Sequence, residues 1–135
     1  MSNDVPVVRS VVSVAAGFFA FMVLGAAADM VLSSTSPGNL EAVRHSNDTS
    51  ALLVQLAYET AFALVSGYIT ARIAVRKPFL HVLVMSAIIF AGRAFIAALA
   101  WNATPAWLNV GVLVLLVPAA LLGAKLSEWR NRSAA

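Results

Sequence analysis

Cysteine is absent from this sequence of 135 residues, and charged residues make up only 11% of it. Without cysteine, disulfides, thiolate nucleophiles and cysteine-ligated zinc, haem or iron–sulfur centres are excluded. The sequence also lacks a glycine-rich phosphate loop, an HExxH helix and a nucleophile elbow, and its two histidines do not stand at metal-ligand spacing. We therefore expect no enzyme activity, no bound metal and no cofactor.

Hydrophobic residues dominate instead, at 61% with a mean hydropathy of +0.86. Soluble domains have roughly 45–50% apolar and about 25% charged residues. Four apolar runs of 20 to 23 residues each match the ~20 that a helix needs to cross about 30 Å of hydrocarbon. The runs are residues 10–32, 51–71, 79–101 and 105–124. The sequence thus predicts an all-α integral membrane protein, with residues 1–135 forming one domain, a four-helix bundle in the lipid bilayer.

Lysine and arginine are distributed unevenly around these runs. Seven of them lie before the first run, between the second and third runs, or after the fourth, whereas Arg44 alone lies in the polar segment 33–50. Because cytoplasmic loops are enriched in Lys and Arg, we predict an up-down-up-down topology with both termini in the cytoplasm and segment 33–50 outside. We expect a plasma membrane of the bacterial (inner-membrane) type. The net charge of +3 comes from these flanking residues, so nucleic acid is not an expected partner.

The first run has an alternative interpretation as a secretory signal. Arg9, the apolar stretch and the small residues 26–28 before Asp29 are compatible with a signal and its cleavage site. The stretch from Val11 to Ala28 is longer than the usual 7–15 apolar residues, which favours a retained helix. Cleavage would leave three helices and an N-terminus outside.

Two opposite charges lie inside the second and third runs. Glu59 and Arg93 are each seventeen residues from Arg76, which lies in the short turn between the runs. At 1.5 Å per residue, each lies about 12 Å from the outer end of its helix. Charges in hydrocarbon are rare and usually face a bundle interior with a partner. We therefore predict that Glu59 and Arg93 meet across an antiparallel helix pair.

Other polar residues share the outer half of the predicted bundle. Gln55 lies one turn before Glu59 on the same helix face. The predicted intramembrane polar cluster is Asp29, Gln55, Glu59, Arg93 and Asn109, in which Asp29 and Gln55 are expected to satisfy the remaining N–H groups of Arg93. Three interpretations stand: a structural ion pair that fixes helix register, a polar site open to the outer face that binds or passes a small ligand, and a contact between Arg93 and a lipid headgroup.

Small residues at four-residue spacing predict where helices approach closely. Helix association in membranes depends on close packing, since lipid tails are as apolar as leucine. Ala63, Gly67 and Ala71 align on one face of the second helix, which makes them the expected packing ridge.

Two functions fit these features. The first is a non-catalytic accessory, assembly or interaction subunit that forms a homo-oligomer or part of a larger membrane complex. The alternative is a small homo-oligomeric transporter or channel, coupled to protons or cations through Glu59.

Overall fold

The computed structural model describes residues 4–35 and 49–133, which form four α-helices. Each of the four is long and apolar enough to cross a membrane. This confirms the predicted all-α architecture of four apolar helices. Most of the expected outer segment, residues 36–48, lies outside the described residues. The helices are α1 (Asp4–Thr35), α3 (Thr49–Ile73), α4 (Pro78–Leu99) and α5 (Ala106–Ser133).

Two helices are longer than their apolar runs. α1 begins at Asp4, and α5 continues to Ser133, nine residues beyond the predicted end at residue 124. The extra turns of α5 are polar, and Arg132 donates to Glu128 four residues earlier at 2.6 Å. Hydropathy marks the apolar part of a helix, whereas such i, i+4 pairs extend the helix into the polar region. α4, in contrast, ends at Leu99, so Trp101 lies in the following turn rather than inside the predicted third helix.

Two short connections join the last three helices. Residues 74–77 link α3 to α4 and end at Lys77, whose φ of 49° places it in the left-handed region. Pro78 follows as the first residue of α4, where a missing backbone N–H is harmless. Residues 100–105 link α4 to α5, and the carbonyl of Pro105 accepts from the backbone N–H of Leu108 at 3.0 Å.

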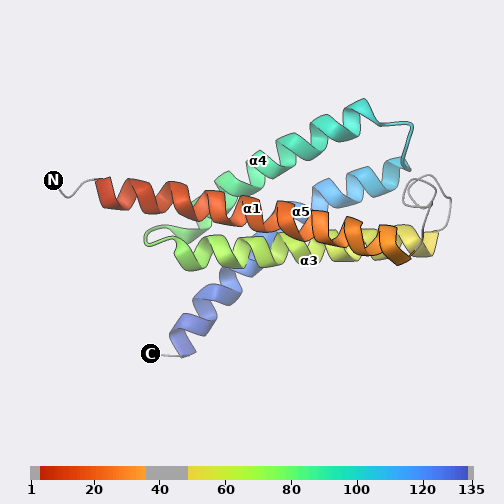
Figure 1. The fold of residues 1–135 in the computed structure, drawn as a ribbon. Coiled ribbons are helices and arrows are strands. Elements are labelled where there is room, and N and C mark those ends of the chain that lie inside the picture. The colour runs from red at the N-terminus through yellow and green to blue at the C-terminus, as the bar shows by residue number, and fades with distance from the viewer. Residues whose placement is uncertain (1–3, 36–48, 134–135) are drawn as a thin grey trace.

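α3 makes the most extensive contacts with the other helices in the described part of the chain. It packs most extensively against α5 and then against α1, whereas its contact with α4, the next helix in sequence, is smaller. In the described part of the chain, α1 and α5 make no close backbone contact with each other. α4 begins beside the other helices and leans away from α1 and α3 toward its C-terminal end (Figure 1).

Glycines allow the close approach of α3 and α5. A Cβ on Gly67 would overlap the carbonyl of Ala120 and lie 2.7 Å from its Cα. On the partner helix, a Cβ on Gly123 would overlap the carbonyl of Leu64 in the same way. Ala63 and Ala71 are 2% and 7% exposed on α3. The predicted ridge Ala63–Gly67–Ala71 is therefore buried, and its central glycine touches α5 backbone.

Candidate functional site

An ion pair joins α3 to α4. The guanidinium of Arg93 donates through Nη2 to Oε2 of Glu59, which is the contact that the sequence predicts. Glu59 is 9% exposed and the Arg93 side chain 33%. Because the two helices are antiparallel around a short turn, equal distances from Arg76 bring the two side chains to the same level.

Gln55 completes the coordination of the carboxylate. Its Nε2 donates to Oε1 of Glu59 at 3.0 Å from the preceding helical turn. Both oxygens of Glu59 therefore accept a hydrogen bond. Gln55 was expected to satisfy N–H groups of Arg93, whereas the contact that the structure shows is to the Glu59 carboxylate, because the i, i+4 spacing on α3 places the amide against it.

Apolar side chains enclose the other side of Glu59. Phe21 from α1 and Val112 and Leu116 from α5 lie around it in a closed, tightly filled space. An uncompensated charge in such surroundings is strongly destabilising. Hydrogen-bonded partners of opposite charge replace much of the interaction with water that the charge loses on burial. The Arg93 and Gln55 contacts are what make a buried carboxylate tolerable at this position.

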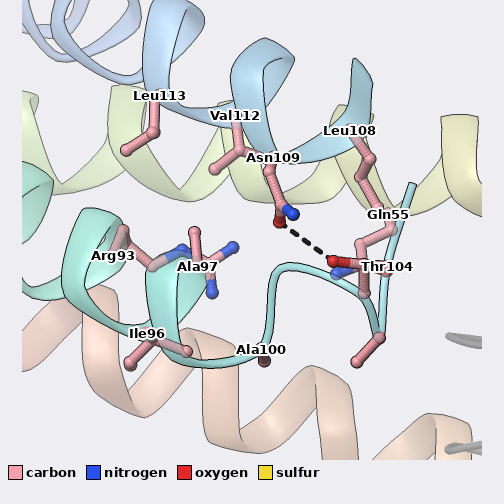
Figure 2. A pocket seen from close by; sticks show the side chains of 11 residues that line it. Gln55, Arg93, Ile96, Ala97, Ala100, Thr104, Leu108, Asn109, Val112 and Leu113 are labelled. Carbon is pink, nitrogen blue, oxygen red and sulfur yellow. Dashed lines mark hydrogen bonds between the residues drawn. The ribbon is translucent and has the colours of Figure 1, made fainter. Parts of the chain in front are cut away.

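A cavity of about 380 Å³ opens beside Arg93, between α3, α4, α5 and the connection 100–105. Figure 2 shows the guanidinium of Arg93 reaching into it from α4, opposite Asn109 of α5. The polar lining residues are Gln55, Arg93, Thr104 and Asn109, and the remainder are alanines and branched aliphatic residues. Three members of the predicted polar cluster thus face one cavity.

Asn109 contributes a buried donor to the cavity. Its Oδ1 accepts from the Thr104 hydroxyl at 3.1 Å, as the dashed line in Figure 2 marks. Its Nδ2 is buried and has no hydrogen-bond partner in the described part of the chain. Buried polar atoms are nearly always paired, so an unpaired one at a cavity wall calls for a physical explanation.

Asp29 is the member of the predicted cluster that the structure does not bring to this cavity. It is half-buried on α1, and the described residues that line the cavity come from α3, α4, α5 and the connection 100–105. Asp29 is therefore not a lining residue of this cavity, and its expected contact with Arg93 stays a prediction.

Thr104 is a cavity residue that the sequence analysis missed. It lies outside the apolar runs, in the connection before α5, and was therefore not counted with the intramembrane polar residues. Its position in the sequence could have indicated this role, because Thr104 lies five residues before Asn109 and directly before Pro105, which marks a helix start. The Thr104–Asn109 hydrogen bond depends on that helix start, which hydropathy alone does not locate.

Comparison with protein-family models, with curated proteins and with solved structures gave no match. The proposals below consequently rest on the geometry of the described residues.

Proposed function

We propose that the protein is an integral membrane protein of four transmembrane helices and serves as a non-catalytic accessory, assembly or interaction subunit. The proposed topology is up-down-up-down with both termini in the cytoplasm, in a bacterial-type plasma membrane. Successive helices run in opposite directions in Figure 1, and the concentration of Lys and Arg at one end supports the orientation.

The observation that carries the proposal is that both carboxylate oxygens of Glu59 already accept hydrogen bonds from neighbouring side chains. A carboxylate that exchanges protons or cations needs an accessible oxygen, but both oxygens of Glu59 accept hydrogen bonds and the residue is 9% exposed. These contacts favour a structural ion pair that fixes α4 against α3 over a carboxylate that couples transport.

A groove between α1 and α4 supports an interaction role. It holds about 510 Å³ and is lined mainly by aliphatic and aromatic side chains, among them Val14, Phe18 and Val84. Concave apolar surfaces on a small helical bundle suit a further helix. We propose that a helix of a second copy or of another subunit packs there.

Flux measurement combined with thermal unfolding tests the structural role. Glu59→Gln and Arg93→Ala are compared with the native protein in detergent and in proteoliposomes carrying a proton, sodium or potassium gradient. We expect lower thermal stability in both variants and no gradient-driven flux in the native protein. Flux by the native protein that Glu59→Gln abolishes, without loss of stability, would instead establish the transporter alternative.

Cross-linking tests the interaction surface, and the cysteine-free sequence makes single-cysteine variants unambiguous. Phe19→Cys lies in the groove, and Val114→Cys on α5 is a matched control because the native side chains are 64% and 62% exposed. With a thiol-reactive photo-cross-linker attached through its maleimide to the introduced thiol, Phe19→Cys in native membranes is expected to form a covalent adduct with a second copy or another subunit on illumination. Equal cross-linking at both positions would refute the groove as the interaction surface.

A further inference from the structure

We infer that the cavity beside Arg93 is a binding site for an oxyanion, a carboxylate or phosphate group, carried by a lipid headgroup or by a free anion. This goes beyond the structural role of the ion pair. A lipid headgroup as the source of the oxyanion rests on the proposed membrane topology. The hydrogen-bond donors of the cavity do not, because they are a property of the fold.

The cavity presents unused hydrogen-bond donors on Arg93. A guanidinium carries five N–H groups, and one contact of Arg93, from Nη2 to Glu59, accounts for its hydrogen bonds within the described residues. A planar guanidinium matches carboxylate and phosphate oxygens well, so the remaining N–H groups of Arg93 would hold a ligand with two or more acceptor oxygens.

The lining argues against a cation. None of the described residues that line the cavity is acidic, and Glu59 is not among them. The side-chain acceptors in the lining are the neutral oxygens of Gln55, Thr104 and Asn109. Hard cations prefer several carboxylate or carbonyl oxygens, which this arrangement does not supply.

The walls suit an oxyanion that is attached to an apolar chain. Ile96, which is 57% exposed, and Ala97 line the cavity from α4, and Leu113 lines it from α5 (Figure 2). A cavity of about 380 Å³ lies within the ~300–1,000 Å³ of ordinary ligand sites, so it exceeds what a single ion fills. Donors together with this apolar lining therefore fit a lipid headgroup, and the donors alone also fit a free anion.

The experiment measures binding to the full-length protein in neutral detergent. The probes are inorganic phosphate, acetate and a short-chain phosphatidylglycerol, with sodium and magnesium chloride as cation controls, and the readouts are calorimetric titration and the shift of Tm. We expect saturable binding of at least one oxyanion probe. Binding of the lipid alone identifies a headgroup as the occupant, whereas binding of phosphate or acetate that competes with the lipid identifies a free-anion site.

Asn109→Asp is the informative variant. It keeps the oxygen that accepts from Thr104 and places a negative charge in the cavity lining, so we expect an anion to bind at least about tenfold more weakly. Asn102→Asp makes the same chemical change at an exposed position of the neighbouring connection and should bind within about twofold of the native protein. Leu113→Asp adds the same charge to the lining one turn further along α5 and replaces Asn109→Asp if that variant does not fold.

Three results would overturn the inference: no saturable binding of any oxyanion probe, equal binding by the Asn109 and Asn102 variants, or stabilisation by the cations alone. These outcomes are separate from a failure of the proposed function, which is measured by flux and by the stability of Glu59 and Arg93 variants. If the protein is stable, shows no gradient-driven flux and binds none of the oxyanion probes, the proposed binding site is refuted and the structural role of the ion pair still stands.

Discussion

The contact between α3 and α5 yields a prediction for Gly67→Ala, with Gly92→Ala as the matched control. Both residues are interior positions of long helices, so replacement by alanine brings the same gain in helix propensity, up to about 1 kcal/mol. The difference lies in their surroundings. An added Cβ at Gly67 lies 2.7 Å from Cα of Ala120, whereas an added Cβ at Gly92 meets no described atom within 4 Å.

The size of the effect follows from this geometry. Cβ atoms essentially never approach other heavy atoms closer than 3.0 Å, and the atoms facing Gly67 belong to the backbone of α5. Such atoms cannot rotate away, so the two helices must separate locally. Inserting extra atoms into a packed core costs about 1–3 kcal/mol. Because the propensity gain cancels, the two variants should differ in unfolding free energy by about that amount, with Gly92→Ala the more stable.

The assay is reversible unfolding in mixed micelles, in which a denaturing detergent replaces a mild one and tryptophan fluorescence reports the helix packing. Gly123→Ala serves as a second test from the opposite helix, because its Cβ would lie 2.8 Å from the backbone nitrogen of Tyr68. Equal stability of Gly67→Ala and Gly92→Ala would show that α3 and α5 do not approach as closely as described here.

Three further predictions concern the ion pair, the turn and the topology. In a double-mutant cycle, Glu59→Gln and Arg93→Ala should each destabilise by less than the about 3–5 kcal/mol of a fully buried pair, because the Arg93 side chain is 33% exposed. The Glu59→Gln/Arg93→Ala double variant should lose less than the sum of the two, and a separate charge-swapped variant should recover part of the loss; strictly additive losses would contradict a direct contact. Lys77→Gly should stabilise by about 1 kcal/mol, because its φ of 49° is strained for a residue with a side chain, and a lower Tm would oppose this. Asn102→Cys should react with an impermeant thiol reagent on intact cells, whereas Ser133→Cys should react only after permeabilisation, and the opposite pattern would reverse the proposed orientation.

The sequence predicted the elements of this fold and one contact between them. Long apolar runs locate membrane-length helices because hydrocarbon thickness fixes how many residues are needed. The Glu59–Arg93 contact was predictable because a short turn relates the two helices by nearly equal distances, and because a charge in an apolar environment needs a partner. Both arguments depend only on spacing along the chain.

Helix neighbours and the cavity could not be predicted in the same way. A short turn makes α3 and α4 consecutive, but how closely they pack depends on side-chain fit, and the tightest contact is instead α3 with α5. Small-residue spacing occurs on α4 as well, at Ala87 and Ala91, yet both of these alanines are exposed. Small-residue spacing shows which helix faces could pack closely. Which of these faces do pack together depends on how well their side chains fit those of the neighbouring helices.

The ion pair and the cavity both follow from the lean of α4. Where α3 and α5 are held by glycine contacts, backbone lies against backbone and the approach needs no long side chain. α4 diverges from α3 toward its C-terminal end (Figure 1), and Arg93 is a long side chain that connects the two helices through a directional contact with Glu59. The same divergence leaves space beside the guanidinium that α5 and the connection 100–105 enclose but do not fill. A substitution that straightened α4 onto α3 would therefore close the cavity and make the arginine unnecessary.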